Sequence, residues 1–178
     1  MTPTLTAFVD GVRIASGDPA QVAAVLRARA DAHESPPILL SDADGRPVDI
    51  DLRASPAPPT AEEPSPARAT RGRPRLGVVP REVTLLPRHW DWLAAQPGGA
   101  SAALRRLVEE ARRTHADADR LRTRREAAYR AMSALAGDAA GFEAAARALF
   151  ADDRTALDAV LTAWPPDVAA YIQARLEA

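Results

Sequence analysis

The chain of 178 residues contains no cysteine and no lysine, and aromatic residues make up only 4 % of it. The lack of cysteine excludes disulfides, thiolate catalysis and zinc–thiolate sites. All 23 basic residues are arginines. A bias in the coding sequence explains an arginine-only chain, and so does selection for bidentate contacts between guanidinium groups and phosphates.

Long apolar runs are also lacking, because none approaches the roughly 20 residues that a membrane-spanning helix needs. The N-terminal residues MTPTLTAFVDG do not show the charged leader and apolar block of a signal peptide. We therefore expect a soluble, cytoplasmic protein with no membrane partner.

Enzyme motifs are absent as well. The three histidines, His33, His89 and His115, lie too far apart for metal-ligand spacing, and no nucleophile elbow, phosphate-binding loop or dinucleotide fingerprint occurs. The sequence therefore predicts a non-enzymatic protein without catalytic residues, cofactor or metal. Acid–base sites built from scattered carboxylates, which leave no motif, stay open as the alternative.

Charge is distributed unevenly along the chain. Residues 1–67 carry 5 arginines and 10 acidic residues, a net charge of −5. Residues 68–130 carry 15 arginines and 7 acidic residues, a net charge of +8, and residues 131–178 return to −4. A basic middle in a nearly neutral protein favours a localised anionic partner. Pairing of this middle with the acidic flanks is the competing explanation.

Residues 4–53 predict a small α+β unit with the order ββαββ. Strand-forming runs at 6–9 and 12–15 flank Asp10-Gly11, a dipeptide that favours a tight hairpin because both residues tolerate positive φ.

A helix should follow this hairpin, with Asp18 as its cap and Pro19 at its first position. A second hairpin should then pair strands 38–40 and 48–52. The last of these alternates apolar and acidic residues. We interpret its acidic cluster as turn-forming and solvated side chains, with a metal site as the less favoured alternative: Asp42, Asp44, Asp49 and Asp51.

Residues 54–70 hold five prolines and no large apolar side chain, so we expect a flexible linker. The basic run that follows resembles an AT-hook and consists of Arg71, Gly72, Arg73, Pro74 and Arg75. The resemblance implies that Arg71 and Arg73 enter the narrow minor groove of A·T-rich DNA. A basic end to a proline-rich linker is the alternative.

A strand-helix-helix element comes next. Residues 81–87 read as a strand, Pro87 opens a tryptophan-bearing helix to Gln96, and Ser101 should cap a second helix after Pro97-Gly98-Gly99. Its inward residues should be Leu104, Leu107, Val108 and Ala111, and its outward arginines include Arg105 and Arg112.

This pattern resembles the ribbon-helix-helix repressor fold, in which two chains pair their strands. The resemblance implies a homodimer in which Arg81, Glu82 and Thr84 lie near bases. It further implies that backbone N–H groups of Gly99, Ala100 and Ser101 hold a phosphate. Because no face of the strand carries two basic side chains, we expect weak sequence selectivity. The alternative is a helical hairpin with a leading strand and no role in nucleic-acid binding.

From Thr114 the helix should continue to about Ala136, and residues 138–178 should add further helices as a tail. Asp152 or Asp153 should cap one of these, and Pro165-Pro166 should open the last. The organisation that we expect is an acidic α+β unit (1–53), a flexible linker (54–70), a basic strand-helix-helix element (71–113) and a helical tail (114–178).

Most of the chain also resembles a bacterial family known only as a domain of unknown function, most clearly in GRPRLGVVPREVTLLPRHWDWLAAQPGGASAALRRLVEEAR. That resemblance implies no activity. Our leading hypothesis is a DNA-binding regulatory or architectural protein that forms a dimer. The second hypothesis is an adaptor that binds protein partners through its N-terminal unit or helical tail.

Overall fold

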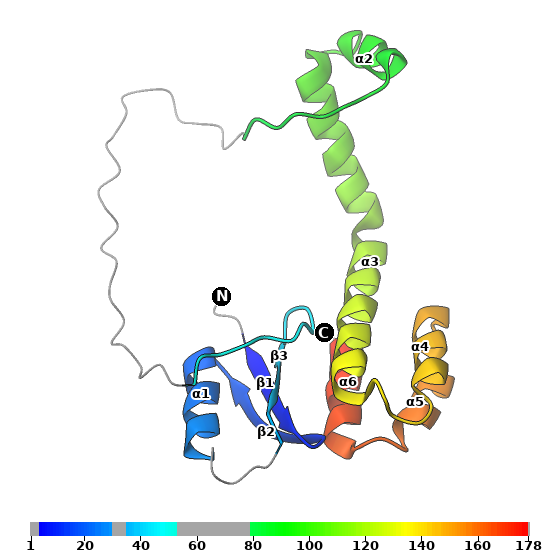
Figure 1. The fold of residues 1–178 in the computed structure, drawn as a ribbon. Coiled ribbons are helices and arrows are strands. Elements are labelled where there is room, and N and C mark those ends of the chain that lie inside the picture. Colours follow the sequence, from blue (N-terminus) through cyan, green and yellow to red (C-terminus); the bar gives the residue numbers. More distant parts are fainter. Residues whose placement is uncertain (1–3, 30–34, 53–78, 178) are drawn as a thin grey trace, which may run out of the picture. The chain divides into compact units, whose positions relative to one another are not determined.

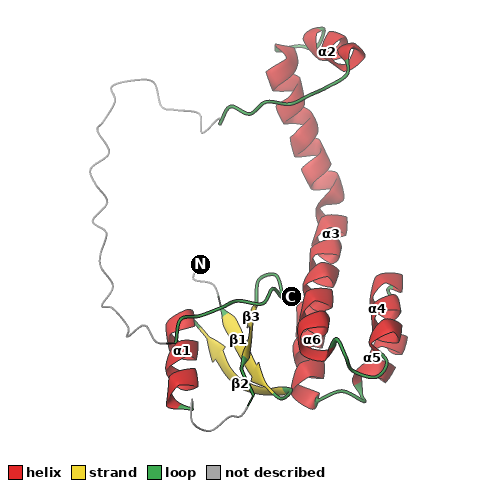
Figure 2. Ribbon diagram, in the orientation of Figure 1, coloured by secondary structure: helices red, strands yellow, loops and turns green. Residues whose placement is uncertain are grey.

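A computed structural model describes residues 4–29, 35–52 and 79–177. It has an α+β fold, as expected: a small sheet with one helix at the N-terminus, followed by a mainly helical region (Figures 1 and 2). The chain divides into two compact units, one of residues 1–56 and 117–178 and the other of residues 57–116.

The predicted first hairpin and its helix are confirmed. Strands β1 (Leu5–Val9) and β2 (Val12–Gly17) pair antiparallel. Asp10 and Gly11, which form the turn between the two strands, both have positive φ. Helix α1 (Pro19–Ala28) has Asp18 as its cap, and the Asp18 side chain accepts a hydrogen bond from the Gln21 N–H at 2.9 Å. Local turn and capping chemistry was therefore sufficient to place this part of the chain.

The predicted ββαββ order is wrong, because no fourth strand forms within residues 35–52. Strand β3 (Ile38–Ser41) pairs with β1, which gives the order β2-β1-β3. Residues 48–52, which were predicted to be the fourth strand, instead follow a single isolated β-bridge between Leu40 and Pro47. Proline has no N–H to donate, so a ladder that begins at Pro47 lacks a donor at its first position.

Both faces of this sheet are covered. Leu5, Ala7 and Leu39 lie in one core with Val22 and Leu26 of α1. On the other face, Phe8 and Leu40 are buried with residues of the C-terminal helices, including Met132, Leu161 and Ile172. The sheet and residues 117–178 thus share one core, whereas the sequence had suggested an N-terminal unit separate from the helical tail.

The helical region follows the predicted boundaries closely. Its helices are α2 (Pro87–Ala94), α3 (Gly99–Ala136), α4 (Phe142–Ala151), α5 (Arg154–Leu161) and α6 (Pro166–Glu177). Asp153 caps α5 by accepting from the Ala156 N–H at 2.9 Å. The long α3 confirms that the helix runs on past Thr114. None of the helices in the described ranges is both long and apolar enough to cross a membrane.

Candidate nucleic-acid interface

The sequence placed its nucleic-acid site in residues 71–113, and the structure describes this site from Val79 onward. Residues Arg71, Gly72, Arg73, Pro74 and Arg75 lie outside the described residues, so the AT-hook stays a prediction. Arg81, Glu82 and Thr84 are exposed.

The strand predicted at residues 81–87 is wrong for the single chain. Residues 79–86 form no strand, and Pro87 already belongs to α2. A strand is defined by its hydrogen-bonded neighbour, and no strand lies within the described residues 79–116 to supply one. Arg81 and Thr84, which were predicted to lie near bases, therefore lie on an extended segment with no strand ladder.

The turn between α2 and α3 is built by glycine. Gly98 and Gly99 have φ values of +81° and +74°, and the Gly99 N–H donates to the Gln96 carbonyl at 2.9 Å. Helix α3 begins at Gly99, so Ser101 lies in its first turn and the prediction that Ser101 caps the helix is wrong. Two consecutive residues with positive φ bring the chain into the helix without a side-chain cap.

This geometry changes the expected phosphate contacts. The Gly99 N–H is already engaged, whereas the N–H groups of Ala100 and Ser101 belong to a first helical turn, which has no intrahelical acceptors. Of the predicted backbone donors, these two are the better placed for an anion.

The arginines of α3 are exposed, as predicted for Arg105 and Arg112. Arg112 pairs with Glu109 at 2.8 Å on the same helix, and both side chains stay more than half exposed. Within residues 79–116, Arg105, Arg106 and Arg113 form no ion pair. Solvent-exposed guanidinium groups of this kind are free to contact a phosphate backbone.

Apolar side chains that the sequence placed inward are instead exposed: Leu107 and Val108 of α3 are 39 % and 54 % exposed. Trp90 and Trp92 of α2 are exposed as well, at 41 % and 51 %. In the described part of this unit, only Leu93 and Ala103 are buried. The helical spacing of Leu107 and Val108 indicated an apolar face, but within the described residues this face stays exposed.

The comparisons with known proteins give one match. A family model described as "Uncharacterized protein conserved in bacteria (DUF2239)" matches residues 4–176. The chain belongs to the DUF2239 family. No curated protein and no solved structure matches the chain.

The model of DUF2239 spans nearly the whole chain, so the acidic flanks belong to the same family unit as the basic middle. In the part of this DUF2239 chain that the structure describes, no group of three or more histidine, aspartate or glutamate side chains lies close enough together to hold a metal ion.

The sequence suggested that the acidic cluster is a set of turn-forming and solvated side chains. In the structure, one of its members, Asp42, is instead engaged in hydrogen bonds. The Asp42 carboxylate accepts hydrogen bonds from Thr6 Oγ1 at 2.8 Å and from the Tyr171 hydroxyl at 2.9 Å. Arg175 donates to the Asp42 carbonyl and lies over the Tyr171 ring at 4.8 Å. These contacts join the sheet to α6, and sequence alone gave no signal for pairs so far apart in the chain.

Tyr171 should make this DUF2239 fold sensitive to alkaline pH. Burial, reinforced by the Asp42 carboxylate, raises the pKa of Tyr171 well above its ordinary range. A raised folded-state pKa stabilises the fold below the unfolded value of about 10, and that stability is lost as pH rises beyond it. Urea midpoints measured from pH 8 to 11 should fall above about pH 10 in the wild type and fall less in Tyr171→Phe. Equal slopes in the two proteins would contradict this role.

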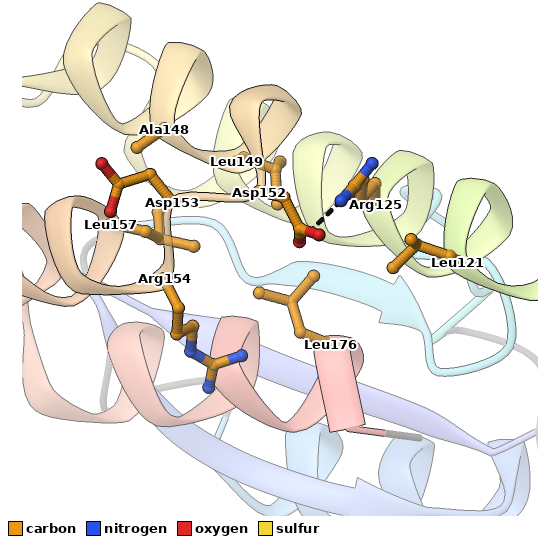
Figure 3. A pocket seen from close by; sticks show the side chains of 9 residues that line it. All are labelled: Leu121, Arg125, Ala148, Leu149, Asp152, Asp153, Arg154, Leu157 and Leu176. Carbon is orange, nitrogen blue, oxygen red and sulfur yellow. Dashed lines mark ion pairs between the residues drawn. The ribbon is translucent and has the colours of Figure 1, made fainter. Parts of the chain in front are cut away.

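A small cavity of about 80 Å³ lies among α3, the α4–α5 turn and α6 (Figure 3). Leu121, Leu149, Leu157 and Leu176 supply most of its apolar lining. Arg125 of α3 reaches Asp152 at its rim, with 2.6 Å between nitrogen and oxygen. This ion pair holds α3 against the α4–α5 turn, which is a structural role in this DUF2239 chain.

Proposed function

We propose that this protein binds DNA through the phosphate backbone, with weak sequence selectivity and in a regulatory or architectural role. The observation that carries the proposal is the set of exposed arginines on α3. Arg105, Arg106 and Arg113 have no ion-pair partner within residues 79–116, and Arg112 is held only by an exposed neighbour. Contacts of this type position a protein on DNA without reading its sequence.

The neighbouring features add to this backbone contact. The first turn of α3 offers the N–H groups of Ala100 and Ser101 to a phosphate. The run from Arg71 to Arg75 would add minor-groove contacts that favour A·T-rich DNA. The extended residues Arg81 and Thr84 would lie close to the duplex if two copies paired their strands as in ribbon-helix-helix proteins.

A salt series with labelled duplexes tests this proposal. Fluorescence anisotropy should show binding whose association constant falls as salt is added, with log K decreasing linearly with the logarithm of the salt concentration. Changing Arg105, Arg106 and Arg113 to glutamine should reduce the slope by about 1 for each arginine that contacts a phosphate. The pair Arg71→Ala and Arg73→Ala should remove any preference for A·T-rich over G·C-rich duplex.

A matched control is Arg154→Gln. This exposed arginine lies on α5, outside residues 68–130, and pairs with Asp158 at 3.4 Å. Its replacement should leave the slope unchanged. The proposal fails if the wild type shows no salt-dependent binding at low salt, or if the triple glutamine variant binds as the wild type does.

A protein–protein adaptor is the second candidate function. The exposed side chains of Trp90 and Trp92 favour it, because large aromatic residues are common at the centres of protein interfaces. A partner captured through these side chains should survive nuclease treatment and be lost in Trp90→Ala with Trp92→Ala. A capture that nuclease abolishes would favour DNA instead.

A further inference from the structure

Helix α3 carries a heptad pattern that the rest of the chain leaves partly uncovered. Apolar or small residues recur at alternating spacings of three and four, the spacing of coiled-coil a and d positions. Leu107, on this stripe, is 39 % exposed, and Leu121, at the end of the stripe where it also lines the cavity beside α6, is 38 % exposed. The stripe from the N-terminal half of the helix is Leu104, Leu107, Ala111, Thr114, Ala118 and Leu121.

In this register the arginines of the proposed DNA contact all point away from the stripe. Arg105 and Arg112 take b positions, and Arg106 and Arg113 take c positions, on the outer side of a coiled coil. All four are exposed. The heptad pattern therefore separates an apolar seam from a basic outer face on one helix.

The residues that flank the seam are complementary for a second copy of the same helix. In a parallel pair, each g position faces the e position of the next heptad in the partner. Glu110 would face His115 of the partner subunit, and Asp117 would face Arg122 of the partner subunit. An antiparallel pair would instead bring Glu110 beside Asp117 of the partner subunit, two like charges.

These flanking groups are available for such pairing. The Glu110 carboxylate and the His115 ring make no ion pair or hydrogen bond in the described part of the chain. Asp117 pairs with Arg120, but the Asp117 side chain is 93 % exposed. Arg122 pairs with Asp119 at 2.9 Å and is 66 % exposed. Exposed pairs of this kind contribute little, so exchanging them for contacts with the partner costs little.

We infer that α3 forms a parallel, two-stranded coiled coil with a second copy of this chain along residues 104–118, before Leu121 meets the cavity beside α6. The occupant of the exposed stripe is thus α3 of the partner subunit, placed by the charges on either side of it. The small residues Ala111, Thr114 and Ala118 at the centre of the seam bury little area, so the dimer dissociates readily. The dimer forms without DNA, so its test is independent of the proposed function.

The absence of cysteine allows a direct test of the orientation. Ala118→Cys in the full chain should form a disulfide-linked dimer under mild oxidation, because a parallel pair sets residue 118 beside its own copy. An antiparallel pair would set residue 118 opposite residue 107. Cross-linking that appears only when Ala118→Cys and Leu107→Cys chains are mixed would overturn the parallel orientation.

Val83→Cys tests the strand pairing of a ribbon-helix-helix dimer. Cross-linking at position 83 and none along α3 would overturn the seam.

Solution mass without DNA tests the seam itself. Light scattering across a concentration series should show a monomer–dimer equilibrium in the wild type and only monomer in Leu107→Asp. Asp117→Arg, which faces Arg122 of the partner subunit, should raise the dissociation constant roughly threefold to tenfold. Adding Arg122→Asp should restore the wild-type value. Arg113→Glu, at an outward position, is the matched control and should change nothing. A wild type that stays monomeric at the highest concentration overturns the inference.

Discussion

Replacing Gly45 by alanine should destabilise the protein by about 2–5 kcal/mol, combining left-handed backbone strain with overpacking. Gly45 has φ +68°, and a Cβ atom there would collide with the Ala127 carbonyl oxygen of α3. That oxygen belongs to the backbone of a packed helix, so it cannot move aside as the end of a flexible side chain would. The change would force the turn after β3 away from α3.

Urea unfolding followed by circular dichroism measures this loss. Ala43→Ser, an exposed position in the same turn, is the control and should stay within about 0.5 kcal/mol of the wild type. If Gly45→Ala unfolds at the wild-type urea concentration, the close approach of this turn to α3 does not exist in solution.

Removing the carboxylate of Asp42 should cost about 3–5 kcal/mol, the usual penalty for leaving one partner of a buried ion pair uncompensated. The side chains of Asp42 and Arg175 are only 13 % and 18 % exposed, and 3.7 Å separates their nearest charged atoms. Asp42→Ala would leave the Arg175 guanidinium without a carboxylate partner and would remove the carboxylate oxygen to which the Thr6 and Tyr171 hydroxyls donate. Each unsatisfied buried donor adds to the loss.

The same unfolding measurement applies, with Asp49→Ala as the matched control. Asp49 belongs to the same acidic cluster but is exposed, so its removal should change the free energy of unfolding by less than about 0.5 kcal/mol. Equal losses in the two variants would show that Asp42 contributes only its charge. In that case the hydrogen bonds to α6 would not stabilise the fold.

Much of the fold could be predicted because its signals are local. Asp10-Gly11 fixed a hairpin, Asp18-Pro19 opened α1, and Pro166 opened α6, each through backbone preferences that a neighbouring residue does not alter. The same reasoning failed at residues 48–52. Their alternating pattern is correct for a half-buried segment, but Pro47 limits the hydrogen bonding that would make them a strand.

The sequence did not show which elements pack against one another. Nothing in the run Leu5–Val9 shows which of its two apolar faces meets α1 and which meets helices more than a hundred residues later. Likewise, the spacing of Leu107 and Val108 marks an apolar face but not what covers it. Of the candidate site, sequence predicted the exposed arginines of α3, but it misplaced the helix start and missed the apolar side chains left open beside them.

The burial of the tryptophans gives the protein two separate spectroscopic reporters. Trp164 is buried and donates its indole N–H to the Ala140 carbonyl at 3.0 Å, whereas Trp90 and Trp92 are exposed on α2. Collisional quenchers such as iodide should therefore reach only the emission of the α2 pair. A ligand that covers α2 would protect that emission and leave the signal of Trp164 unchanged. Unfolding of the residue 117–178 core would shift the emission of Trp164 to longer wavelength. Binding and unfolding can thus be followed separately in one unlabelled sample.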